Sequence, residues 1–150
     1  MSEQTITTHS VQETYECARK IADHLKAGQV LCLQGELGSG KTTFVKGLAA
    51  QFGVDEEEIQ SPTFTLIHEY KRNGFLPLYH MDCYRLEREE EALEIGMEDY
   101  FYGEGVSVVE WPEKVGSLIP EGAIWVRIDI KGQETRQFFI SNFSSEFDNF

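Results

Sequence analysis

The segment GELGSGKTT is the feature that most limits what this chain of 150 residues can fold into. It matches the pattern G-x-x-x-x-G-K-[ST], with Gly35 and Gly40 as the spaced glycines and Lys41 and Thr42 behind them. Glycines allow the tight backbone curvature that points successive N–H groups at phosphate oxygens, and a following helix adds the positive end of its dipole. The motif therefore predicts a phosphate-binding loop between a buried strand and a helix.

The residues on either side have the patterns that such a loop requires. Residues 29–34 (QVLCLQ) are almost continuously apolar, as in a strand buried on both faces. Residues 41–52 carry apolar side chains at helical spacing before a terminating Gly53. We expect Lys41, as a catalytic residue, to contact the β and γ phosphates of ATP, and Thr42 to bind Mg²⁺ through its hydroxyl. The predicted ATP-binding segment, here called the phosphate loop, consists of Gly35, Glu36, Leu37, Gly38, Ser39, Gly40, Lys41, Thr42 and Thr43.

The rest of the chain alternates between strand and helix patterns. Ser10 and Glu13 have the spacing of a capping box, which predicts a helix with Val11 on its apolar stripe. The Asn73-Gly74 pair predicts a hairpin that lies beside the strand of the phosphate loop. Strands are predicted at residues 4–8, 29–34, 61–70, 75–84, 106–109, 123–130 and 135–140, helices at 11–25, 41–52 and 86–95, and a loose tail at 141–150.

These elements predict one domain over residues 1–150, because the sequence contains no repeat, linker or low-complexity segment. The expected fold class is α/β, a three-layer sandwich of the P-loop NTPase type with a mixed parallel and antiparallel sheet.

Two carboxylates at predicted strand ends are candidates to support magnesium. Glu110 ends the strand VSVVE, and we assign it to the metal, directly or through water. Asp82, in LYHMDCY, is assigned to the hydrolytic water, as a catalytic residue, or to the outer sphere of the metal. A capping or ion-pairing role is the alternative for each acid.

Several further residues near these strands are weaker candidates. Ser61, Pro62, Thr63 and Thr65 lie where P-loop proteins commonly sense the γ-phosphate, although a plain turn has the same local chemistry. His80 would share a strand face with Asp82 and support the site, or be an ordinary packed or exposed histidine. Arg85 is a candidate to neutralise transition-state charge, with a surface ion pair as the alternative.

The charge balance bears on partners and location. Acidic residues outnumber basic ones 26 to 13, so most of the surface repels nucleic acid, and any role on RNA is expected to be indirect. The acidic run over residues 87–104 predicts a solvated helix face or a docking surface for a basic partner. Three unpaired cysteines indicate reduced thiols, and we find neither a signal peptide nor a membrane span. We therefore expect a cytoplasmic protein that does not bind membranes.

Five segments in order, GELGSGKTT, SPTFTL, YHMDCYRL, GMEDYF and VVEWPEK, resemble the TsaE (YjeE) family. The resemblance runs from about residue 29 to about residue 120, and Glu36 and Ser39 depart from the typical GDLGAGKTT. It implies an ATPase required for threonylcarbamoyladenosine in tRNA, which acts with TsaD and TsaB after TsaC has supplied the activated group. Its nucleotide cycle would prepare the TsaD–TsaB complex for repeated turnover, with weak hydrolysis by the isolated chain and only indirect contact with tRNA.

The same resemblance implies site residues. The motif positions of the family fall on Lys41 and Thr42, on the switch-like residues 61–65, on Asp82, and on Glu110 with Trp111. Trp111 and the switch-like residues would couple the nucleotide to the partner proteins.

Other P-loop functions remain open from the sequence. A small metabolite kinase would need the same loop, but only Arg127 and Arg136 follow Arg88, and neither lies in an obvious arginine-rich lid. A GTPase would carry an NKxD segment, which the sequence lacks. A nucleotide-gated assembly module, in which hydrolysis is incidental, is the remaining alternative.

Overall fold

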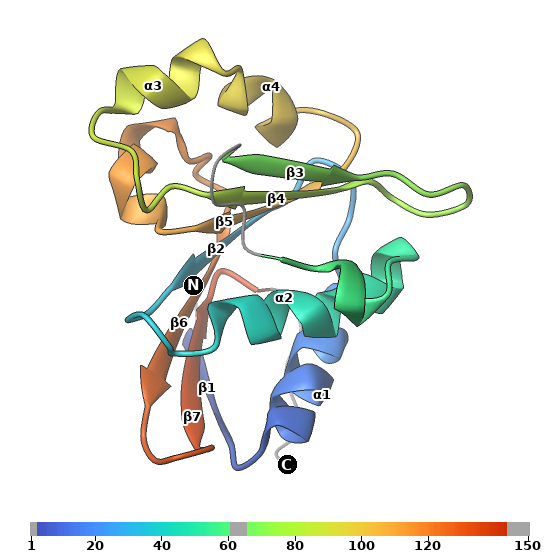
Figure 1. Cartoon of the computed structure of the whole chain (residues 1–150), viewed down its shortest axis with the longest axis vertical. Helices are drawn as coiled ribbons and strands as arrows, with labels where there is room; N and C mark the ends of the chain where they lie inside the picture. The colour runs from blue at the N-terminus through green and yellow to red at the C-terminus, as the bar shows by residue number, and fades with distance from the viewer. Residues whose placement is uncertain (1–2, 61–65, 144–150) are drawn as a thin grey trace.

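The computed structural model describes residues 3–60 and 66–143. Its centre is a seven-stranded sheet in the order β1-β7-β6-β2-β5-β4-β3 (Figure 1). Strands β4, β5, β2 and β6 run parallel to one another, whereas β3, β7 and β1 pair antiparallel with their neighbours. The strands are β1 (Glu3–Thr8), β2 (Val30–Gln34), β3 (Ile67–Tyr70), β4 (Leu78–Asp82), β5 (Val106–Glu110), β6 (Ile124–Ile130) and β7 (Arg136–Ser141).

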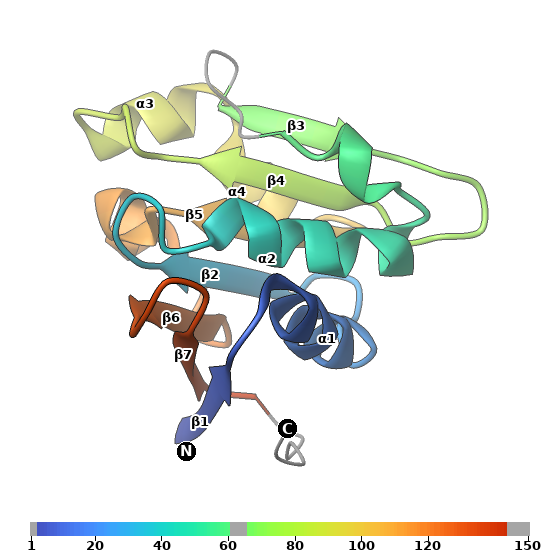
Figure 2. The same ribbon diagram turned by 60° about the horizontal axis from the view of Figure 1, so that its bottom comes forward.

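Helices cover both faces of this sheet (Figures 1 and 2). One face carries α1 and α2, which pack against each other, and the other carries α3, α4 and η3. The α-helices are α1 (Val11–Ala22), α2 (Lys41–Leu48), α3 (Glu89–Glu94) and α4 (Met97–Phe101). The short 3-10 helices are η1 (Ala49–Phe52), η2 (Glu56–Glu58) and η3 (Pro112–Leu118). The predicted three-layer α/β sandwich with a mixed sheet is therefore confirmed.

Strand β2 shows why this layering follows from the sequence. Leu31 and Leu33 point into the core beneath α1 and α2, whereas Val30 and Cys32 point into the core beneath α4 and η3. Successive side chains of a strand alternate between faces, so a strand covered on both sides must be apolar throughout. The run before the phosphate loop is continuously apolar because both faces of β2 are covered.

The predicted hairpin exists, but its position in the sheet was predicted incorrectly. Strands β3 and β4 pair antiparallel, and the turn at Asn73-Gly74 closes with a hydrogen bond from the Phe75 N–H to the Arg72 carbonyl, 3.2 Å long. Strand β5 lies between this hairpin and β2, so the hairpin does not pair with the strand of the phosphate loop. Turn chemistry specifies which strands pair locally and carries no information about the next strand in the sheet.

Two predicted helices also differ in detail. Residues 86–95 were predicted as a helix, whereas α3 spans only Glu89–Glu94, and α4, which begins after Gly96 with its φ of 75°, was not predicted. The N-terminal cap of α1 is as predicted, with the Ser10 hydroxyl accepting from the Glu13 N–H at 3.1 Å. Val11, however, is exposed, whereas Ala18 and Ala22 of the predicted stripe are buried together with Cys17 and Ile21.

Part of two predictions lies outside the described residues. The strand predicted at 61–70 is described from residue 66 onward, and the tail predicted at 141–150 is described only to residue 143. None of the described helices combines the length and the apolar character that crossing a bilayer requires.

Candidate functional site

The phosphate loop connects the carboxyl end of β2 to α2, at the edge where the parallel strands β4, β5 and β6 also end (Figure 1). Two of its glycines are required by geometry. Gly40 precedes α2 with a φ of 107°, which side-chain-bearing residues rarely adopt. A Cβ atom on Gly35 would lie 2.9 Å from the Ile128 carbonyl oxygen and 2.5 Å from Ser39 Oγ. The loop can therefore take this shape only with glycine at both positions.

Lys41 folds back over its own loop. Its Nζ donates to the carbonyl oxygens of Gly35 at 2.6 Å and Glu36 at 3.0 Å, and lies 4.3 Å from the centre of the Trp111 ring. Burial lowers the pKa of Lys41, and the carboxylates of Glu110 and Asp82 act against that shift. The ammonium group thus lies against the loop, in contact with two backbone carbonyls and the Trp111 ring.

The two candidate carboxylates end neighbouring parallel strands. Asp82 of β4 and Glu110 of β5 are register partners, so both reach the same edge of the sheet. A cavity of about 350 Å³, here called the loop cavity, lies between these acids and the phosphate loop. Its lining residues are Leu37, Gly38, Gly40, Lys41, Thr42, Thr43, Asp82, Tyr84, Glu110 and Trp111. The fold therefore brings the predicted lysine, threonine and both acids together around one hollow.

Each acid is held differently. Glu110 is only 3% exposed, and its Oε2 lies 2.5 Å from Nε2 of His80, which is fully buried. Asp82 accepts the Tyr84 N–H at 2.9 Å. Burial raises the pKa of Asp82 despite that hydrogen bond, with the Glu110 charge adding to the increase. Glu110 is therefore a fixed carboxylate, and Asp82 a more basic one than an exposed aspartate.

The donors that face the loop cavity suit a hard divalent cation. Magnesium prefers oxygen ligands, and the Thr42 hydroxyl and the two carboxylates supply them. Within the described part of the chain, no group of three or more His, Cys, Asp or Glu side chains forms a metal cage by itself.

Trp111 closes one side of the loop cavity in an uncommon backbone conformation. Its φ of 58° and ψ of 50° are left-handed, which is rare for a bulky residue, and Pro112 begins η3 directly afterwards. The Tyr84 ring lies with its centre 4.9 Å from that of Trp111. Strain of this kind concentrates at functional sites, and here it lies in the turn after β5, beside the loop cavity.

A larger cavity of about 590 Å³ is lined by Gly35 and Glu36 at the start of the phosphate loop. Arg127 and Asp129 of β6 and the following Lys131 contribute to its wall, while Lys41 and Thr42 do not.

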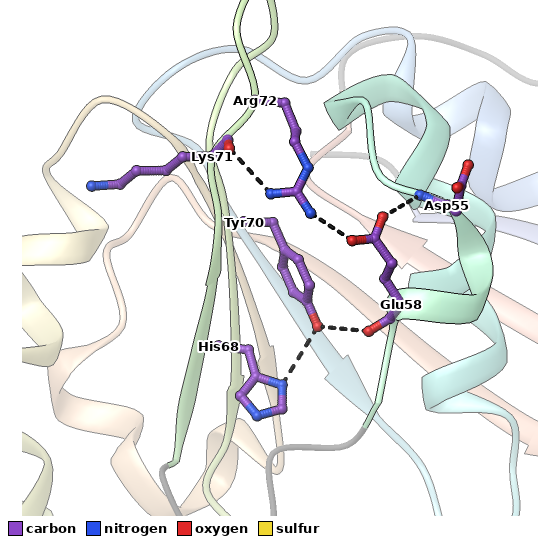
Figure 3. A network of polar contacts seen from close by, with 6 residues as sticks. All are labelled: Asp55, Glu58, His68, Tyr70, Lys71 and Arg72. Carbon is purple, nitrogen blue, oxygen red and sulfur yellow. Dashed lines mark hydrogen bonds and ion pairs between the residues drawn. The ribbon is translucent and has the colours of Figure 1, made fainter.

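The switch-like residues Ser61, Pro62, Thr63 and Thr65 lie outside the described residues. On their two sides, a network of polar contacts joins η2 to β3 (Figure 3). Glu58 accepts the Arg72 guanidinium at 2.6 Å through its side chain and the Tyr70 hydroxyl at 3.3 Å through its carbonyl. The chain shortly before residue 61 is thus tied to the chain shortly after residue 65.

Two arginines lie outside the lining of the loop cavity. Arg85 is exposed and does not line the loop cavity. Arg136, at the start of β7, was missed: its Nε donates to the Ser39 carbonyl at 2.8 Å. No local pattern could have revealed this contact, because the two residues are 97 positions apart in the sequence.

Comparison with known proteins gives a consistent result. Residues 8–138 match the family model described as threonylcarbamoyl adenosine biosynthesis protein TsaE. A Bacillus subtilis protein named tRNA threonylcarbamoyladenosine biosynthesis protein TsaE is 44% identical over 130 residues, covering 87% of this chain and 80% of the relative. A Treponema pallidum protein of the same name is 42% identical over 134 residues, covering 89% of this chain and 97% of the relative.

A solved structure agrees with the sequence relatives. The crystal structure of Bacillus subtilis YdiB superposes with a TM-score of 0.76 at 36% identity, covering 93% of this chain and 84% of that one. The resemblance inferred from the motifs is confirmed, and the chain belongs to the TsaE family of threonylcarbamoyl adenosine biosynthesis proteins.

Proposed function

We propose that this chain is the ATP-binding, ATP-hydrolysing subunit of tRNA threonylcarbamoyladenosine biosynthesis, acting on the TsaD–TsaB complex to permit repeated turnover. One observation carries the proposal: Lys41, Thr42, Asp82 and Glu110 converge on the loop cavity of a chain that belongs to the TsaE family. The family membership supports the pathway, and the cavity supports the chemistry.

The phosphates of ATP bind along the phosphate loop, where backbone N–H groups and the start of α2 provide positive potential. Lys41 exchanges its bonds to the Gly35 and Glu36 carbonyls for bonds to the β and γ phosphates. Lys41 thus already lies against its own loop before the phosphates bind.

Thr42 and Glu110 are the residues that would hold Mg²⁺, which neutralises charge on the phosphates when bound. The bond from His80 fixes the Glu110 carboxylate in orientation, so it does not need to be ordered when the cation binds. Glu110 therefore fits a ligand that is fixed in advance.

Asp82 orients the water that attacks the γ-phosphate and accepts its proton. Its raised pKa supports this role, because a more basic carboxylate is a better proton acceptor near neutral pH. Asp82 lines the same cavity as Lys41, which supports a role near the γ-phosphate.

The described lining of the loop cavity contains no arginine. We therefore propose that the isolated chain hydrolyses ATP slowly and that TsaD–TsaB accelerates it by completing the site. The test compares ATP hydrolysis by this chain with and without TsaD and TsaB, and we expect a higher rate in the complex. Equal rates would contradict activation by the partners.

Hydrolysis itself is tested with Asp82→Ala and Asp82→Asn in the complex. We expect both variants to bind ATP, to lose hydrolysis and to stop repeated rounds of tRNA modification. Modification that continued through many rounds without hydrolysis would instead identify an assembly module gated by nucleotide binding.

A further inference from the structure

Arg136 joins the phosphate loop to a distant turn. Its Nε donates to the Ser39 carbonyl at 2.8 Å, and its Nη1 donates to the carbonyls of Gly132 at 2.9 Å and Thr135 at 3.0 Å. The last two residues belong to the turn between β6 and β7. One planar guanidinium thus fixes the position of the loop relative to the turn. A lysine ammonium on its flexible stem would hold the two less rigidly.

The carbonyl that Arg136 holds belongs to the peptide unit between Ser39 and Gly40. Because a trans peptide is planar, the Ser39 C=O and the Gly40 N–H point in opposite directions. Gly40 lines both the loop cavity and a small cavity on the other side, and Ser39 and Arg136 line only the second. Because Arg136 holds the Ser39 carbonyl from that second side, we infer that the opposed Gly40 N–H is directed toward the loop cavity.

We propose that Arg136 is a positioning residue that orients the Gly40 amide for hydrogen bonding to a phosphate oxygen. The inference rests on the proposed function, because it requires the loop cavity to bind phosphates. Gly40 has no side chain to restrict its own conformation, and the buried Ser39 hydroxyl has no hydrogen-bond partner among the described residues. The guanidinium is the group that can fix this peptide from outside the loop.

Direct contact between Arg136 and the nucleotide is the alternative explanation that the experiment must distinguish. Arg136 also lines a small cavity of about 70 Å³ beside the loop, together with Val11, Thr14, Gly40 and Thr43. A direct contact there with the nucleoside part of ATP would affect ATP and ADP but not inorganic tripolyphosphate. Orientation of the Gly40 amide affects all three ligands, because each carries phosphates.

The experiment titrates magnesium tripolyphosphate and ADP into the full-length wild type, Arg136→Met and Arg127→Met by calorimetry. Arg127 is the matched control, an arginine on the neighbouring strand β6 that pairs with Asp129 at 3.4 Å and does not line the loop cavity. We expect Arg136→Met to bind both ligands about tenfold more weakly, which corresponds to about 1.4 kcal/mol. Arg127→Met should match the wild type.

The Gly40 amide resonance provides a readout that general destabilisation would not move. In the wild type it should shift strongly when tripolyphosphate binds, and in Arg136→Met the shift should be smaller at saturation. Unchanged tripolyphosphate affinity in Arg136→Met, or weakening of ADP alone, would overturn the inference.

Should Arg136→Met fail to fold, Arg136→Lys is the variant to test. A lysine keeps the charge but cannot bridge Ser39 and the turn in a fixed geometry, so tripolyphosphate binding should still weaken several-fold. Wild-type affinity in a folded Arg136→Lys would overturn the inference. A wild type that binds neither ligand would contradict the proposed function itself, which distinguishes the two failures.

Discussion

His80 Nε2 lies 2.5 Å from Glu110 Oε2. Both side chains are buried, and they belong to the neighbouring strands β4 and β5. The pair has two consequences. It provides the hydrogen bond that a buried carboxylate needs, and it fixes the direction in which Glu110 meets the loop cavity. Stability and site geometry thus depend on the same contact.

His80→Ala should destabilise the fold strongly. Removing one partner of a buried ionisable pair leaves the other without its hydrogen bond, which typically costs about 3–5 kcal/mol. Urea denaturation of the free protein measures the loss. Arg72→Ala is the control, because it breaks an exposed ion pair with Glu58, and solvent-screened pairs of this kind contribute little to stability. Equal losses in the two variants would show that the His80 contact contributes no special stability.

Lys41→Met should reduce ATP affinity by about 100-fold, because two charge-assisted contacts worth about 1.5 kcal/mol each are lost. Calorimetric titration with magnesium present measures the affinity. Lys46→Met is the control, since Lys46 lies in the last turn of α2 and does not line the loop cavity. ATP affinity that survives Lys41→Met would exclude Lys41 as a phosphate ligand.

Ser39→Ala should raise the free energy of unfolding by about 1 kcal/mol, because the buried hydroxyl pays for desolvation without a hydrogen bond among the described residues. Ser107→Ala in β5 provides a second case, since its hydroxyl is also buried and unpartnered within the same described residues. Thermal and urea denaturation measure both. Destabilisation of both variants by a similar amount would show that the hydroxyls do form hydrogen bonds.

Glu58 should titrate below the ordinary range of a glutamate. The Asp55 N–H is the main cause of its lowered pKa, and the Arg72 guanidinium adds to it (Figure 3). A pKa that is lower in the folded state contributes stability above the unfolded pKa of about 4.3, and this contribution disappears as the pH falls through the folded pKa.

The carboxyl resonance of Glu58, followed as a function of pH, measures that pKa. In Arg72→Met it should rise but stay below the ordinary value, because the Asp55 N–H remains. Lys71→Met is the control, since Lys71 pairs with Glu69 at 3.5 Å instead. An identical Glu58 pKa in the wild type and in Arg72→Met would show that Arg72 does not contribute to lowering it.

Local patterns accounted for the part of the fold that surrounds the phosphate loop. The apolar run of β2, the glycines and the start of α2 are contiguous, so their chemistry can be read in order. Asp82 and Glu110 were predicted as strand-end acids, and the parallel register of β4 and β5 brings them to one cavity. Their division of roles stays a prediction.

Long-range relationships were not predictable in this way. No residue in the β3–β4 hairpin indicates that β5 lies between it and β2. The bond from Arg136 to Ser39 exists only because β7 pairs with β6, whose carboxyl end lies beside the loop. Helix α4 was not predicted, and it begins only after the left-handed Gly96.

We propose that ATP bound at Lys41 and Thr42 drives repeated rounds of threonylcarbamoyladenosine formation. The direct test is a reconstituted assay with TsaC, TsaD, TsaB, tRNA, ATP and magnesium, in which modified nucleoside per TsaD–TsaB complex is measured by mass spectrometry. With this chain present we predict many modifications per complex, and with the chain omitted or replaced by Lys41→Met no more than about one. Equal amounts of modified nucleoside per complex with and without the chain would contradict a role of the chain in repeated turnover.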